Sequence, residues 1–294
     1  MNKIYGLLVL IGSVCYGIQS SLVKILYSYG ITMWQVLLLE YMLGSAIFLT
    51  YVFIRERKEL FSLSFSSIFK LFILAILGPG LTSVFYYLAL SYLPASLGVV
   101  FLFQYLIFIV IFNKLLNKAP ISLFQVMAMI LIFLGTLLAV DLFSIDLQGF
   151  EWKGAFFGVL AALSYAIFLF FTEETSHIST PAVRSAIIAT SIMIAAFVVK
   201  NPLEVFSQIE VSLSTFILLG LLITLIGQVI PLIAFNIGVP KIGSQLAGII
   251  SSFELPAAIL FASVLLKEKM ELTQWIGIIL ITIAIVVSEL KSDK

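Results

Sequence analysis

The feature that most constrains this chain is a stretch without any charged residue from Leu71 to Asn113. A single helix over this stretch would be about 65 Å long, which is about twice the hydrocarbon thickness of a bilayer. Proline disfavours a helical conformation for the residue before it, so Tyr92-Leu93-Pro94 is the natural place to divide the stretch. The sequence therefore predicts two membrane-spanning helices that a short turn joins into an antiparallel hairpin.

Apolar runs of this kind recur along the whole chain. Hydrophobic residues make up 62% of the 294 positions and charged residues 11%, whereas soluble domains are about half apolar and a quarter charged. Lipid must therefore be the solvent for much of the surface. The first run, from Ile4 to Val23, could span a bilayer and lacks a clear cleavage site, so we expect a retained span rather than a signal peptide. The pattern predicts an all-α integral membrane protein with ten transmembrane helices, at residues 4–26, 32–54, 70–91, 95–116, 121–141, 153–173, 182–200, 212–236, 243–266 and 272–289.

The composition argues against several other classes of protein. A net charge of +1 gives no electrostatic footprint for nucleic acid. The single cysteine, Cys15, excludes an intrachain disulfide, and with the single histidine, His177, it leaves too few ligands for a typical zinc site. The sequence has neither a phosphate-binding Gly-x-x-x-x-Gly-Lys-Ser/Thr motif nor a Ser/His/Asp constellation. We therefore expect neither an enzyme nor a protein with a metal or another cofactor.

Lysines and arginines in the short loops indicate how the chain is oriented. If the N-terminus lies inside, 11 of the 16 basic residues fall on the inner side and 5 on the outer side. With an even number of spans, this bias predicts a multi-pass protein of the cell membrane whose two termini are both cytoplasmic.

A shift of 149 residues brings the two halves of the chain, 1–146 and 147–294, into loose register. The first five spans then fall on the last five, and identical residues coincide: Tyr16 with Tyr165, Gly78 with Gly227, Lys118 with Lys267, and Gln125 with Gln274. Because each half has an odd number of spans, the second half must be inverted relative to the first. Inverted repeats are typical of transporters that alternate between outward-open and inward-open states. The alternative is an old duplication kept for stability.

Several segments of the chain resemble the drug/metabolite transporter superfamily, of the EamA type. The best segment is residues 251–256, Ser-Ser-Phe-Glu-Leu-Pro, followed by the Leu-Lys-Glu turn at residues 266–268, Gly277 and Leu280-Ile281. The first half carries a weaker copy, in which Gln104-Tyr105 stands near the glutamate position and Ala119 replaces the glutamate of the turn. The resemblance implies ten helices around a central cavity lined mainly by spans one to four and six to nine. It also implies export or exchange of metabolites.

Glu254 is the leading candidate for a functional group, because it lies midway along an otherwise uncharged span. A charge at the bilayer centre costs about 2.5–3.5 kcal/mol on insertion scales, so this side chain should face protein or a wet cavity. Pro256 removes a backbone donor two residues later and should kink the helix there. A carboxylate beside a helix break suits a proton or cation site. A structural glutamate that is hydrogen-bonded to a neighbouring helix is the alternative.

Glu40 is a second carboxylate inside a predicted span. Sequences that this chain resembles often carry a basic residue in that span, so Glu40 departs from their pattern. It could pair with Lys24 or Arg184, or stay neutral within the membrane. Two membrane carboxylates could bind protons that are coupled to transport, or recognise a cationic group of a substrate.

Other candidates are polar, aromatic or helix-breaking residues within the spans. Tyr16 and Gln19 adjoin a small-residue stripe in span one, whose alternative role is close helix packing. Interrupted helices at matching positions in two halves are a pointer to a binding site, although simple kinks are the alternative. The candidate breaks are Gly78, Pro79, Gly80, Gly227, Pro231 and Pro256, and the further candidate contacts are Gln104, Gln228, Tyr86, Tyr87 and Tyr165.

Together these features predict a secondary transporter that exports or exchanges a small organic metabolite, with protons as a candidate coupling ion and the lipid bilayer as its surroundings. An amino acid or a related amine is the expected substrate by analogy with the resembling family. A multidrug or amphiphile exporter is the first alternative, and a membrane scaffold or sensor without flux is the second. The internal duplication argues against a channel, which is often assembled from several subunits.

Overall fold

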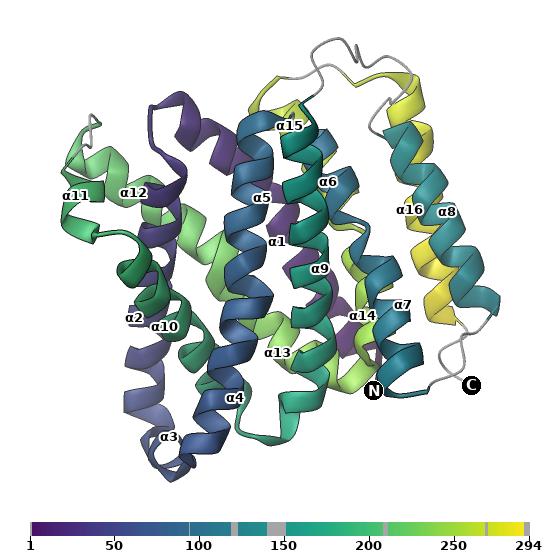
Figure 1. Ribbon diagram of the computed structural model, residues 1–294. Helices are drawn as coiled ribbons and strands as arrows, with labels where there is room; N and C mark the ends of the chain where they lie inside the picture. The colour runs from purple at the N-terminus through teal and green to yellow at the C-terminus, as the bar shows by residue number, and fades with distance from the viewer. Residues whose placement is uncertain are drawn as a thin grey trace.

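The computed structural model describes residues 2–93, 95–118, 123–139, 151–207, 211–267 and 270–290, and every regular element in them is helical (Figure 1). The first half contains α1 (Asn2–Ser28), α2 (Met33–Arg55), α3 (Arg57–Ser62), α4 (Phe65–Ala75), η1 (Ile76–Gly80), α5 (Leu81–Tyr92), α6 (Ala95–Leu102), α7 (Tyr105–Leu116) and α8 (Leu123–Ala139). The second half contains α9 (Trp152–Glu174), η4 (Thr175–His177), α10 (Pro181–Val199), α11 (Pro202–Phe206), α12 (Leu213–Thr224), η5 (Leu225–Val229), α13 (Ile230–Ile242), α14 (Ser244–Ser251), α15 (Glu254–Leu265) and α16 (Leu272–Leu290).

Seven helical stretches of the described residues are long and apolar enough to cross a membrane. They are Lys3–Ser28, Met33–Arg55, Phe65–Tyr92, Trp152–His177, Pro181–Val199, Ser214–Ile242 and Ser244–Leu265. Three shorter apolar helices cover Val100–Leu116, Val126–Ala139 and Leu272–Ala284. The prediction of an all-helical protein with several membrane spans is therefore confirmed. The predicted boundary between residues 146 and 147 lies outside the described residues.

Local sequence sets several of the helix ends. Thr32 starts α2 with a capping box, in which its hydroxyl accepts from the Gln35 amide and the Gln35 side chain accepts from the Thr32 amide. Thr180 caps α10, and Pro181 occupies the first turn, where its missing N–H has no cost. The predicted hairpin turn is also present, because α5 ends at Tyr92 and α6 begins at Ala95. Pro94 itself lies outside the described residues.

The two halves of the chain keep the 149-residue register in their element boundaries. η1 and η5 are both π-helical interruptions, and their first and last residues differ by that shift. The same shift relates both ends of α6 to α14 and both ends of α7 to α15. Lys118 and Lys267, which the sequence already paired, share a left-handed backbone with φ of 51° and 57°. The predicted internal repeat is therefore present in the structure.

α1 lies at the centre of the bundle, packed against α13 and α15. A β-carbon added at Gly17 would lie 2.6 Å from the backbone oxygen of Glu254, so α1 approaches α15 as closely as glycine allows. α5 packs against α9, and α2 packs against α10. α8 and α16 pack mainly against each other at the edge of the bundle (Figure 1). The helices packed around α1 therefore form the core of the bundle, whereas α8 and α16 lie at its periphery.

Two charged side chains at pseudo-equivalent positions hold the hairpins at opposite ends of the bundle. Lys24, near the end of α1, donates to the carbonyls of Leu90 at 2.8 Å and Leu93 at 3.2 Å, at the end of α5. Glu173, 149 residues later near the end of α9, accepts from the backbone amide of Ser244 at 2.7 Å, at the start of α14. A cation thus faces a helix C-terminus and an anion faces a helix N-terminus, which are the favourable signs for the two helix dipoles.

Candidate functional site

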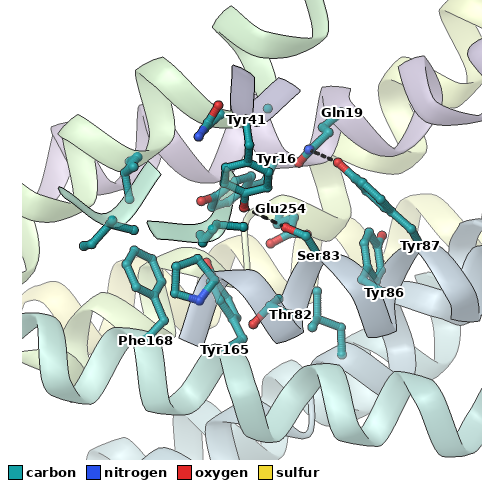
Figure 2. A pocket seen from close by; sticks show the side chains of 17 residues that line it. Tyr16, Gln19, Tyr41, Thr82, Ser83, Tyr86, Tyr87, Tyr165, Phe168 and Glu254 are labelled. Atoms are coloured by element: carbon teal, nitrogen blue, oxygen red, sulfur yellow. Dashed lines mark hydrogen bonds between the residues drawn. The ribbon is translucent and has the colours of Figure 1, made fainter. Parts of the chain in front are cut away.

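A cavity lies in the middle of the bundle, between elements of both halves (Figure 2). The cavity volume is about 50 Å³, and the space between the protein atoms is about 600 Å³ when the part open to the outside is included. Its lining is mostly aromatic, apolar or uncharged polar, with one carboxylate. The lining residues are Tyr16, Gln19, Tyr41, Pro79, Thr82, Ser83, Tyr86, Tyr87, Leu102, Tyr165, Phe168, Ile188, Ile192, Gly227, Gln228, Leu232 and Glu254.

Glu254 reaches this cavity from a break in a membrane-length helix. α14 ends at Ser251, and Glu254 is the first residue of α15. Pro256 has no amide to donate to the Ser252 carbonyl, and that carbonyl accepts instead from the Leu255 amide at 3.3 Å. The side chain of Glu254 is only 3% exposed, and within the described part of the chain its carboxylate has no hydrogen-bond partner. The break therefore presents an unpaired acceptor to the cavity.

The equivalent break in the first half carries a different side chain. Tyr105 is the first residue of α7 and lies 149 residues before Glu254. Its hydroxyl donates to the carbonyl of Gly248 on α14 at 2.7 Å, so it ties the two broken helices together. Gln104, which the sequence also placed near the glutamate position, is half-buried and lines a separate, mostly apolar groove between α6, α7 and α8. Of these two residues, Tyr105 is thus the counterpart of Glu254.

Glu40 belongs to a hydrogen-bonded cluster beside the cavity. Its carboxylate is 1% exposed and accepts from the Tyr87 hydroxyl at 2.6 Å and from the Gln19 amide at 3.0 Å. The Gln19 amide also donates to the Tyr87 hydroxyl at 2.7 Å. The predicted alternatives for a partner, Lys24 and Arg184, donate instead to backbone carbonyls, of Leu90 and Leu93 and of Asn236. The hydrogen bonds shown to Glu40 therefore come from neutral groups, and they supply the partners that a buried carboxylate needs.

Four aromatic rings form one wall of the cavity and the layer behind it. The rings of Tyr16 and Tyr165, which occupy equivalent positions in the two halves, meet edge to face with centroids 6.2 Å apart. Phe235 stacks on Tyr16 at 5.6 Å, and Phe168 lies 6.2 Å from Tyr165. Figure 2 shows Tyr16, Tyr165 and Phe168 around the same space as Glu254. Such an array gives both apolar surface and ring faces that attract cations.

The helix interruptions also reach the cavity. In η1, Gly78 has a non-helical backbone (φ −88°, ψ −109°), and the next residue, Pro79, lines the cavity. In η5, Gly227 faces the Glu40 cluster so closely that an added β-carbon would lie 2.7 Å from a Glu40 oxygen. Two further candidates flank these segments, since Gly80 is the last residue of η1 and Pro231 is the second residue of α13. The interruptions thus bring backbone and glycine surface to the cavity from both halves.

Three further polar side chains of the lining are unpaired besides Glu254. Both amide atoms of Gln228 and the hydroxyls of Tyr86 and Tyr165 are buried without a hydrogen-bond partner among the described residues. Gln228 is 3% exposed, and it fits because Gly44 opposite has no side chain. Unsatisfied buried groups are costly and uncommon, so a cavity that holds several of them is suited to a polar ligand.

Several lining residues were not singled out in the sequence. The hydroxyls of Tyr41 and Ser83 are 2.9 Å apart, and Thr82 is beside Ser83 (Figure 2). The sequence marked these residues only by their positions. Tyr41 is next to Glu40, and Thr82 and Ser83 come just after the Gly-Pro-Gly segment. Within the described ranges, no three His, Cys, Asp or Glu side chains come together as a metal site would require. The lining is thus suited to binding by hydrogen bonds, rings and one carboxylate.

Comparisons with known proteins give a family and a fold. The sequence profile of the EamA-like transporter family matches residues 3–140 and again residues 152–290. One solved crystal structure of a protein aligns with a TM-score of 0.74 over 97% of each chain, at 17% sequence identity. No curated protein matches the sequence. The family match thus covers the chain as two successive repeats, and the structural match shows a shared fold.

Proposed function

We propose that this chain, which belongs to the EamA-like transporter family and is a multi-pass membrane transporter for a small molecule, is a secondary carrier. The proposed carrier exports or exchanges an organic metabolite, which is an amino acid or a related amine. The single observation that carries the proposal is the position of the cavity. It lies between two repeats whose helices are interrupted at matching positions, η1 with η5 and the α6–α7 break with the α14–α15 break. Interrupted helices at the interface of two repeats are the usual way in which carriers build a binding site.

The proposed architecture is ten spans in two inverted repeats that alternate around the cavity. Contacts between α8 and α16 support the inversion, because Gln274 near the start of α16 donates to the carbonyl of Ala139, at the end of α8. A β-carbon at Gly135 would lie 3.0 Å from the Gly277 carbonyl, so a residue earlier in α8 meets one later in α16. These equivalent helices are thus antiparallel, as an inverted repeat requires. The excess of basic residues supports cytoplasmic termini and a place in the cell membrane.

Glu254 is the proposed coupling group, which takes up a proton in one facing state and releases it in the other. It lines the cavity at a helix break and is unpaired within the described residues. The titratable groups around it are tyrosine hydroxyls, of Tyr16, Tyr86, Tyr105 and Tyr165. A carboxyl group is a much stronger acid than a phenol, so Glu254 is the member of this set that can cycle between its charged and neutral forms.

The test begins with a thermal-unfolding screen of the purified chain against amino acids and amines, followed by flux of each stabilising solute into liposomes. A ligand at 100 times its dissociation constant should stabilise the native state by about 2.7 kcal/mol. Transport should depend on pH in the wild type, and Glu254→Gln should remove that dependence. Gln104→Leu, in the separate groove, serves as the control and should keep it. Full pH-dependent transport by Glu254→Gln would show that Glu254 is not the coupling group.

A further inference from the structure

The charges of the cavity restrict the kind of substrate that it can hold. Among the lining residues described, Glu254 is the only charged one. Arg184 is the buried cation among the described residues; it lies one helical turn before Ile188 on α10 and donates to the Asn236 carbonyl, outside the lining. A carboxylate on the substrate would therefore find no cation in the cavity wall, and it would be repelled by Glu254 if that group were ionised.

Each unpaired polar residue of the lining offers an acceptor of hydrogen bonds, and the Gln228 amide nitrogen and the hydroxyls of Tyr86 and Tyr165 can also donate. The carboxylate of Glu254, the hydroxyl oxygen of Tyr86 and the side-chain carbonyl of Gln228 are each without a partner among the described residues. A primary ammonium group has three N–H donors and no acceptor. Glu40, by contrast, already accepts from Tyr87 and Gln19 and does not line the cavity. The two carboxylates thus differ, and Glu254 is the one available to a ligand.

The rings beside Glu254 suit a cation as well. Tyr16, Tyr165 and Phe168 line the same cavity, and Figure 2 shows them around the space that Glu254 enters. A ligand cation over an aromatic face is attracted by the negative face of the ring, most strongly where water is excluded. Aromatic rings also provide apolar surface against which the hydrocarbon part of an amine can pack.

We propose that the substrate is a small organic cation with a single positive charge, bound with its ammonium group against Glu254 and its apolar part against the Tyr16, Tyr165 and Phe168 rings. The inference rests on the proposed carrier function and gives it a substrate class. It favours amines over zwitterionic amino acids. The competing possibility is a zwitterion that spans from Glu254 to Arg184, whose Nε and Nη1 have no partner among the described residues.

The test compares three ligands that share one phenol ring and differ in charge: tyramine (a cation), its neutral alcohol analogue tyrosol, and tyrosine (a zwitterion). Binding to the purified full-length chain is measured by the rise in its unfolding temperature with ligand concentration. Tyramine is expected to bind, with tyrosol and tyrosine at least about tenfold weaker. Glu254→Gln should weaken tyramine by about 30-fold or more, the low end for losing one partner of a buried charge pair. Gln104→Leu is the matched control and should bind tyramine as the wild type does.

Several results would overturn the proposal. Equal or tighter binding of tyrosine or tyrosol would do so, and so would unchanged tyramine binding in Glu254→Gln. A folded wild type that binds none of tyramine, benzylamine and tetraethylammonium would also refute it. If Glu254→Gln does not fold, the wild-type series alone decides. Failure of the carrier function is separate, because it would appear as amine binding without flux in liposomes, whereas flux of a zwitterion or neutral solute without amine binding would refute only the substrate class.

Discussion

Replacing Gly17 by alanine should disturb the contact that positions Glu254. The added β-carbon would lie 2.6 Å from the Glu254 carbonyl oxygen and 2.8 Å from the Ala258 amide nitrogen. Both atoms belong to the backbone of α15, so no side-chain rotation relieves the clash. Restoring an ordinary contact of 3.4 Å requires α1 and α15 to separate by about 0.8 Å. Overpacking of this kind typically costs about 1–3 kcal/mol.

Unfolding of the purified variants in mixed detergent micelles would measure this cost, and tyramine binding would report the displacement of Glu254. Gly98→Ala is the matched control, because its β-carbon would lie 2.9 Å from a methyl group of Leu90, the end of a flexible side chain. Gly17→Ala should lose about 1–3 kcal/mol of unfolding free energy and bind more weakly, whereas Gly98→Ala should lose less than about 1 kcal/mol. Equal losses in the two variants, or a Gly17→Ala protein as stable as the wild type, would refute the reasoning.

Three further changes have expected outcomes. Glu173→Ala removes the acceptor for the first amide of α14 and should lower the unfolding free energy by about 0.5–2 kcal/mol, as loss of a helix N-cap does; an unchanged value would mean that water replaces it fully. Lys24→Met removes a charged donor from two carbonyls at the end of α5, so a loss of about 1.5–3 kcal/mol is expected in the same assay, and a gain in stability would contradict that. Gln228→Leu removes an unpaired buried amide, so the unfolding free energy should stay within about 1 kcal/mol or rise while tyramine affinity falls; lost stability with unchanged affinity would assign Gln228 a structural role instead.

Much of the helical framework could be predicted because its signals are local in the chain. The uncharged stretch could not be one helix in a bilayer, and the turn near Tyr92 is present as expected. The repeat could also be detected, since a fixed shift aligned residues such as Lys118 and Lys267, which share an unusual backbone conformation. Length limits and sequence periodicity therefore suffice for the order of the elements.

The arrangement of the site could not be read in the same way, because it depends on contacts between distant helices. Pro256 indicated a kink, but the break begins at Ser252, before Glu254 rather than after it. Glu40 finds its partners in Gln19 on α1 and Tyr87 on α5, and its own neighbours in sequence gave no sign of either. The sequence pattern shows that Glu40 lies within an apolar span, where a buried carboxylate needs hydrogen-bond partners. Which groups supply them is decided only when the helices pack.

The most direct test of the carrier account is the accessibility of one cavity position from the two sides of the membrane. Cys15 is the only cysteine, so a Cys15→Ser chain with Ser83→Cys carries a single thiol in the cavity lining. Membrane-impermeant maleimide is applied to right-side-out and inside-out vesicles, with and without tyramine. Alternating access predicts that tyramine changes labelling in opposite directions on the two sides. Equal labelling from both sides that tyramine leaves unchanged would contradict a carrier and indicate an open pore.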